Sequence, residues 1–190
     1  MPADSAPINL TNHFLIAMPG LSDDLFGRSV VFMCEHSDRG ALGLVINKPS
    51  DILLPRLFEK VELALGRADL VQLPVFQGGP VQTERGFVLH RPVGDWDSML
   101  RIGDELGVTT SRDILTALAA GNGPQDILVA LGYAGWGPGQ LEHELAQNAW
   151  LNCPADARIL FELPSGARWD AAAALIGVDI TRLSNDAGHA

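Results

Sequence analysis

The sequence predicts an α+β fold, because strand-like segments fill the first half of the chain and helical segments dominate the second. Short apolar runs bounded by glycine, proline and aspartate are typical of strands, and they occur mainly before residue 103. After that point, apolar residues recur mostly at helical spacing. This order of elements differs from the regular strand–helix alternation of a parallel α/β protein.

Three strands are expected near the N-terminus, over residues 13–18, 29–36 and 41–47. The four residues 37–40 have the composition of a hairpin loop, since Gly40 adopts positive φ at little cost. Proline cannot donate to a β-ladder, so we expect Pro49 to end the third strand.

The middle of the chain mixes a helix with short strands. Residues 52–61 show helical spacing, although Pro55 requires the helix to begin late or to kink. A strong turn signal follows, Gln-Gly-Gly-Pro at 77–80. Two further strands are expected at 86–90 and 99–102.

The second half begins with a sequence that resembles a capping box, Thr-Ser-Arg-Asp at 110–113. It opens a helix that Gly121 ends. The remaining elements are expected in this order: a strand at 126–131, a Gly-rich loop at 132–139, a helix at 140–148, an extended piece at 150–153, a helix at 167–176 and a last turn at 180–183.

Length and composition indicate a folded chain. With 190 residues, 47% of them hydrophobic and 19% charged, the chain can build a sizeable core. We expect residues 1–9 to be a flexible lead-in and residues 10–190 to form one domain. Thirteen Lys and Arg against 23 Asp and Glu give a net charge of −10, which disfavours general binding to nucleic acid or to an anionic membrane.

The sequence also favours a cytoplasmic location. Two cysteines, Cys34 and Cys153, are too few for a disulfide framework and favour free thiols in a reducing compartment. The apolar stretch 14–18 is too short for the core of a signal peptide and follows no Lys or Arg. No apolar run approaches the roughly 20 residues of a membrane helix, so no membrane association is expected.

The Gly-rich segment 132–139 has two interpretations. Between a strand and a helix, such a loop can present backbone N–H groups to a phosphate. Against that role, Gln140 stands where the last glycine of a dinucleotide fingerprint would fall, and no lysine follows the segment as in a Walker loop. Glu142 and Glu144 would also repel an anion. A tight structural turn is the other interpretation.

Metal and catalytic motifs are weak. Cys34 and His36 lie two apart on an expected strand and would share a face, but two ligands are too few for structural zinc. The segment Glu142–Glu144, Glu-His-Glu, places three potential ligands in a row, yet adjacent helical residues diverge. No serine stands in a Gly-x-Ser-x-Gly motif. We therefore predict no catalytic residue, metal or cofactor.

Trp136 stands out because it is flanked by glycines, so it either plugs the core or lines a pocket. Its indole N–H needs a partner if buried, and Glu142 or Asn148 could supply one. The helix at 140–148 carries Glu142 and Glu144 and no Lys or Arg, which makes it a poor DNA-recognition helix. Direct DNA binding is therefore not expected.

Several long motifs resemble the bacterial YqgE/AlgH family. They are HFLIAMP at 13–19, GALGLVINKP at 40–49, QGGPV at 77–81, GFVLH at 86–90, LGYAGWGPGQLE at 131–142 and GHA at 188–190. The resemblance runs from about Leu10 to the last residue. It implies a curved mixed or antiparallel sheet that forms a pseudo-barrel flanked by helices, in a bacterial cytosolic protein. Members often carry the label of transcriptional regulators, through a link to alginate production in some bacteria. The family supplies no agreed catalytic residue, cofactor or ligand.

Two main functions are consistent with these observations. The first is an indirect transcriptional regulator that binds another protein or a small effector. The alternative is a small-molecule-binding protein or an enzyme with an unrecognised site around residues 132–142. An interaction module without chemistry, marked by an exposed apolar patch, is a third. The oligomeric state stays open. Polar residues of the family-matching motifs are the candidate ligand contacts: Asn47, Lys48, His90, Trp136, Gln140, Glu142 and Asn148.

Overall fold

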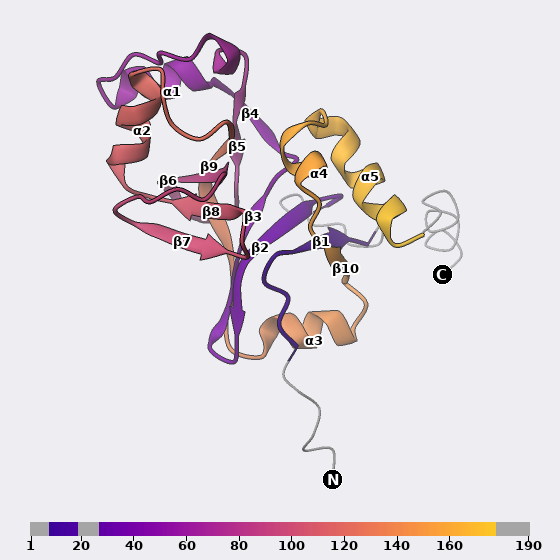
Figure 1. The fold of residues 1–190 in the computed structure, drawn as a ribbon. Helices are drawn as coiled ribbons and strands as arrows, with labels where there is room; N and C mark the ends of the chain where they lie inside the picture. Colours follow the sequence, from indigo (N-terminus) through magenta and orange to yellow (C-terminus); the bar gives the residue numbers. More distant parts are fainter. Residues whose placement is uncertain (1–7, 19–26, 178–190) are drawn as a thin grey trace.

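The computed structural model describes residues 8–18 and 27–177 (Figure 1). The strands in these ranges are β1 (His13–Ala17), β2 (Val30–Ser37), β3 (Gly40–Val45), β4 (Pro49–Leu53), β5 (Pro74–Gln77), β6 (Val81–Arg91), β7 (Met99–Ile102), β8 (Leu106–Thr109), β9 (Asp126–Trp136) and β10 (Trp150–Pro154). The helices are α1 (Leu54–Lys60), α2 (Arg112–Ala119), α3 (Gln140–Ala146), α4 (Ala157–Phe161) and α5 (Arg168–Leu175), with short 3₁₀ turns η2 (Ala68–Leu70) and η3 (Ser165–Ala167).

All ten strands belong to one curled sheet, a half-barrel flanked by helices, which confirms the predicted α+β class. The strand order is β10-β1-β2-β3-β9-β6-β8-β7, and β4 and β5 branch from it beside β9. The pairs are antiparallel except for β5 with β9, which run parallel. β9 is therefore the central strand, because it pairs with β3, β6 and β5.

Three hydrophobic cores lie against the two faces of this sheet. Alternate residues of β1 show the division, since Phe14 and Ile16 face the core under α4 and α5, while Leu15 and Ala17 face the core under α3. The third core lies between β6, β9 and the helices α1 and α2. Figure 1 shows α1 and α2 together at one end of the molecule, α3 at the opposite end, and α4 beside α5. Strands buried on both faces explain the continuous apolar runs of the sequence.

The expected Gly-rich loop is wrong, because β9 continues as a strand to Trp136. Its last residues pair with β3, from Gly43 opposite Ala134 to Ala41 opposite Trp136. Pro49 does not end the third strand either. β3 ends earlier, at Val45, and Pro49 begins β4, whose partner is the neighbouring strand β5.

The start of α2 also differs from the capping box. Ser111 is the N-cap residue, but its hydroxyl donates to Asp113 Oδ1 instead of accepting from the helix backbone. Asp113 in turn accepts the N–H groups of Ile114 and Asp97. α1 begins at Leu54 with Pro55 in its first turn, as expected. Strands β4, β5 and β8 and helix α4 were not predicted, and the expected turn at 180–183 lies outside the described residues.

The longest described helices, α2 and α5, have eight residues each, and none of the described helices is long and apolar enough to span a bilayer.

Candidate functional site

Helix α3 is attached to the sheet by the partly exposed carboxylate of Glu144. Glu144 Oε1 accepts the indole N–H of Trp136 at 3.0 Å and that of Trp150 at 2.9 Å. Gln140 donates to the other oxygen, Oε2, at 3.0 Å. The two indole rings meet edge to face, with centroids 6.1 Å apart. The partner of Trp136 is thus Glu144 and neither Glu142 nor Asn148, because α3 directs its second glutamate across the end of β9.

A histidine joins the same arrangement from β2. The Leu10 N–H donates to His36 Nδ1 at 3.0 Å, so the proton lies on Nε2, which donates to Glu142 Oε1 at 3.2 Å. The His36 side chain is buried, whereas that of Glu142 is 40% exposed. We call the joined residues the α3 clasp: His36, Trp136, Gln140, Glu142, Glu144 and Trp150.

Three of the candidate contact residues, Trp136, Gln140 and Glu142, therefore meet in the α3 clasp. Asn47 and Lys48 lie elsewhere and hold the segment before β2. Asn47 accepts from the Val30 N–H at 2.9 Å and donates to the Arg28 carbonyl at 2.8 Å. Lys48 Nζ donates to the carbonyl of residue 27 at 2.7 Å. Both side chains make backbone hydrogen bonds typical of a structural role.

The other two candidates also lie apart from the clasp. His90 is fully buried on β6, between the Pro92 carbonyl at 3.0 Å from Nδ1 and the Thr109 hydroxyl at 2.7 Å from Nε2. Burial lowers the pKa of His90, so the neutral imidazole is favoured. Asn148 follows α3 with a φ of 59°, a left-handed conformation that asparagine tolerates at the end of a helix.

Glycines let the backbone at Gly79 come very close to the backbone of β9 at Gly132 and Tyr133. A Cβ built on Gly79 would lie 2.1 Å from the Tyr133 carbonyl carbon, and one on Gly132 would lie 2.4 Å from the Gly79 oxygen. No larger residue fits where backbone meets backbone at that distance. At the start of α3, the Gly137 N–H donates to Gln140 Oε1 at 3.0 Å. These contacts favour the structural interpretation of the Gly-rich segment over a phosphate site.

The expected shared face of Cys34 and His36 is wrong. The pairing of β2 with β3 shifts register between Met33 and Glu35, and this bulge interrupts the alternation of side chains. Cys34 packs into the core under α4 and α5, while His36 turns toward the α3 clasp. Burial raises the pKa of the Cys34 thiol, so it is an inert hydrophobe. In residues 8–18 and 27–177 no three His, Cys, Asp or Glu gather as metal ligands.

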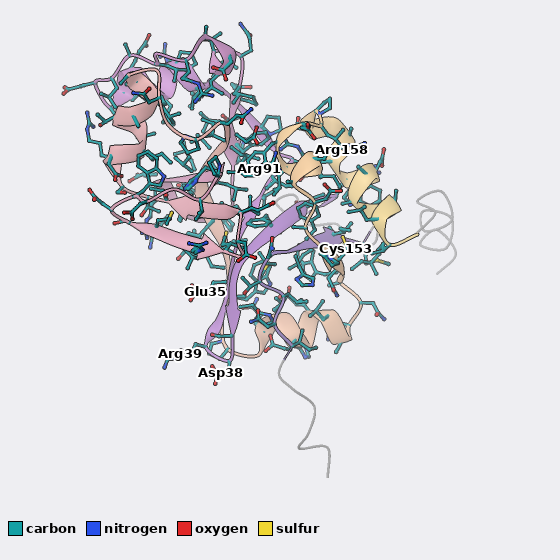
Figure 2. All side chains as sticks on the ribbon, in the orientation of Figure 1. Glu35, Asp38, Arg39, Arg91, Cys153 and Arg158 are labelled. Atoms are coloured by element: carbon teal, nitrogen blue, oxygen red, sulfur yellow. The ribbon has the colours of Figure 1, made fainter. Side chains whose placement is uncertain are left out.

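The described residues enclose several concave regions, and two of them are large enough to compare with ligand pockets. An open groove of about 420 Å³, the Tyr133 groove, lies beside the hairpin of β2 and β3 and is lined by Glu35, Arg39, Tyr133, Gly135 and Trp136 among others. Figure 2 shows Glu35 and Arg39 on this hairpin, away from α4. The Gly132–Glu142 segment thus contributes one wall of a groove, although only Trp136 of the candidate residues lines it.

A second region, the Arg168 cavity, has a volume of about 290 Å³ between α4, η3 and the strands β5 and β9. Arg168 is only 6% exposed and stands at the start of α5. Sequence reasoning missed this residue, because an arginine that begins a helix usually lies in solvent. Its neighbour Trp169 in an alanine-rich helix is a weak signal that this end of α5 is buried.

Known proteins resemble the chain over almost its whole length. A family profile described as AlgH-like matches residues 14–181. A UPF0301 protein of Variovorax paradoxus is 58% identical over all of both chains, and one of Nitrosococcus oceani is 56% identical over 94% of this chain and 96% of its own.

Two solved structures share the fold. The AlgH protein from Pseudomonas aeruginosa has a TM-score of 0.78 and 49% identity, over 95% of this chain and 96% of its own. A protein from Corynebacterium diphtheriae has a TM-score of 0.73 at 19% identity, over 96% of this chain and 95% of its own, and supports the fold alone. The family profile, the close relatives and the AlgH structure agree with the motifs of the sequence, and the chain belongs to the AlgH-like family.

Proposed function

We propose that this protein is a regulator that acts through a bound small effector or a partner protein, and not through direct contact with DNA. The observation that carries the proposal is the placement of positive charge in the described residues. α3, which stands at one end of the sheet, carries Glu142 and Glu144 and no Lys or Arg. A helix that enters the major groove needs cations, because affinity for DNA comes largely from neutralised phosphates.

Some of the other cations are paired with carboxylates or buried, although exposed arginines such as Arg56 and Arg101 remain. Arg67 pairs with Asp69 and Arg91 with Asp126, each at 2.8 Å. Arg168 is buried and cannot reach a phosphate backbone. The net charge of −10 also repels DNA at long range, in addition to the pairing and burial of these cations.

The concave regions support the effector part of the proposal. The Tyr133 groove, at about 420 Å³, falls within the usual range for ligand pockets, and the Arg168 cavity, at about 290 Å³, lies at its lower end. Each region combines apolar walls with a charged side chain, Arg39 in the first and Arg168 in the second. A small molecule bound at either place could alter a surface that a partner protein reads.

Fluorescence anisotropy tests the DNA part of the proposal. The pure protein is titrated against labelled genomic DNA fragments at low salt and then at rising salt, with a helix-turn-helix protein as positive control. We expect no saturable binding even at low salt. Saturable binding that weakens steeply as salt rises would require a basic face and would overturn the proposal.

A further inference from the structure

Arg168 is a buried cation. Its residue is 6% exposed, and burial lowers the pKa of its guanidinium to about 10. Since that value still lies well above neutral pH, the side chain keeps its charge inside the protein. A buried charge is normally paired with an opposite charge or bound to a ligand.

The hydrogen bonds of Arg168 leave its charge without a carboxylate. Nε donates to the Leu163 carbonyl at 3.2 Å, one terminal nitrogen donates to the Ile46 carbonyl, and the guanidinium carbon lies 5.0 Å from the centre of the Phe76 ring. A guanidinium has five N–H donors, so donors remain beyond these two bonds. No Asp or Glu oxygen of residues 8–18 or 27–177 lies within 4.0 Å of it.

The surroundings of the guanidinium are apolar. The Arg168 cavity is lined mainly by aliphatic and aromatic side chains, among them Leu54, Leu73, Phe76, Leu128, Leu160 and Leu163. Its other charged lining residue is Glu162, which is exposed. A ligand that fits this lining has one anionic group for Arg168 and an apolar body for the remaining walls.

We propose that the Arg168 cavity binds a small amphipathic monocarboxylate, with its carboxylate on Arg168 and its hydrocarbon body along the leucine-lined wall. A planar carboxylate matches the forked donors of one guanidinium. A phosphate monoester fits less well, because its second negative charge would meet no second cation among the lining residues. A volume of about 290 Å³ corresponds to roughly ten water-sized groups, which suits a chain of about eight carbons.

This inference deepens the proposed function by naming the chemistry of the effector, and it rests on that proposal only for its regulatory meaning. The two can fail separately. DNA binding in the anisotropy experiment would overturn the proposed mode of regulation without touching carboxylate binding. A protein that binds neither DNA nor carboxylates would keep the regulator proposal and lose this one.

Isothermal titration calorimetry on the full chain tests the inference with matched eight-carbon probes: octanoate, 1-octanol, octyl phosphate and octylamine. We expect octanoate to bind at least about tenfold more tightly than 1-octanol, since a charge-assisted hydrogen bond distinguishes them. Octyl phosphate should bind more weakly than octanoate, and octylamine should not bind. The affinity for an aromatic acid, 3-phenylpropanoate, is compared with that for octanoate to show whether the carboxylate ligand has an aliphatic or an aromatic body. Equal binding of octanoate and octanol, or no octanoate binding, would overturn the proposal.

Three variants localise the binding. Arg168→Met should bring octanoate to within about twofold of octanol, since the carboxylate then has no cation. Arg158→Met removes an exposed arginine of α4 that does not line the cavity, and it should leave both affinities unchanged. Glu162→Gln keeps Arg168 and the fold, and it should tighten octanoate by about twofold with no change for octanol, because a repelling charge is lost. An equal loss of octanoate affinity in Arg168→Met and Arg158→Met would contradict the site. So would a Glu162→Gln variant in which the affinities for octanoate and octanol change by the same factor.

Discussion

The α3 clasp and the Arg168 cavity both hold charged side chains against the sheet, but the hydrogen bonds of these charges differ: Glu144 is partly exposed, whereas Arg168 is buried. In the clasp, the two oxygens of Glu144 accept hydrogen bonds from Trp136, Trp150 and Gln140. At the cavity, Arg168 donates to two backbone carbonyls and meets no carboxylate of the described residues. A fully satisfied polar network stabilises a fold, whereas a charge left incomplete beside a cavity is a mark of ligand binding.

The comparison also changes the meaning of the family motifs. Polar residues of the Gly132–Glu142 stretch attach α3 to the sheet, and Gly132 lies where the backbone of Gly79 comes close to β9. The candidate ligand-binding cation comes from a segment outside every quoted motif. The family motifs described here therefore contain residues that stabilise the fold. The charge of Arg168, which has no carboxylate partner among the described residues, could be recognised only from the structure.

Breaking the clasp is expected to have the largest effect. Glu144→Ala leaves the indole N–H groups of Trp136 and Trp150 without their carboxylate acceptor, at about 1–3 kcal/mol each, so we expect a loss of about 2–6 kcal/mol in the free energy of unfolding. Urea unfolding followed by tryptophan fluorescence measures it. His143→Ala, at the next exposed position of α3, is the matched control and should change stability by less than about 0.5 kcal/mol. Equal effects of the two variants would mean that the clasp does not stabilise the fold.

Much of the fold could be predicted from the sequence, because the apolar runs of β1, β2 and β3 and the periodicity of α3 and α5 are local signals. The need of Trp136 for a hydrogen-bond partner could be predicted as well. Which glutamate accepts the indole N–H of Trp136 depends on the angle at which α3 meets β9, and no local pattern encodes that angle. In a sequence, glycines signal a turn. The close approach of Gly79 to the backbone of β9 could therefore not be distinguished from a loop.

The rest of the site depends on long-range packing. The bulge in β2 that separates Cys34 from His36 leaves no recognisable mark in the sequence. Arg168 stands at the start of a helix, where arginine is ordinarily solvated. It is buried only because α4 and η3 pack over β5 and β9 around it.

His90 is a buried polar residue outside both regions, and it extends the comparison to the effect of pH on stability. Its pKa is lowered by burial, so between that pKa and about 6.5 the unfolded chain binds more protons than the folded one. Stability contributed by the neutral imidazole is therefore complete above about pH 6.5 and is lost as pH falls, by at most about 1.4 kcal/mol per pH unit. We expect His90→Gln to lose less stability than the original protein between pH 7 and pH 5 in urea titrations. His143→Gln, on the exposed face of α3, should follow the original protein, and parallel curves for all three would contradict the assignment.

The smallest change in the free energy of unfolding is expected for a substitution of Arg168, whose charge has no carboxylate partner among the described residues. Arg168→Met removes two hydrogen bonds to carbonyls but also removes the cost of burying a cation without an anion, so the free energy of unfolding should change by less than about 1 kcal/mol. Arg67→Met is the matched comparison, because Arg67 pairs with Asp69 at 2.8 Å and also donates to three backbone carbonyls, and it should cost about 2–3 kcal/mol. Urea unfolding with and without octanoate completes the test. The ligand should stabilise the original protein and the Arg67 variant, and it should stabilise Arg168→Met much less, since stabilisation by mass action follows affinity for the folded state. A loss in Arg168→Met as large as in Arg67→Met would place Arg168 with the residues of the clasp, as a part of the fold.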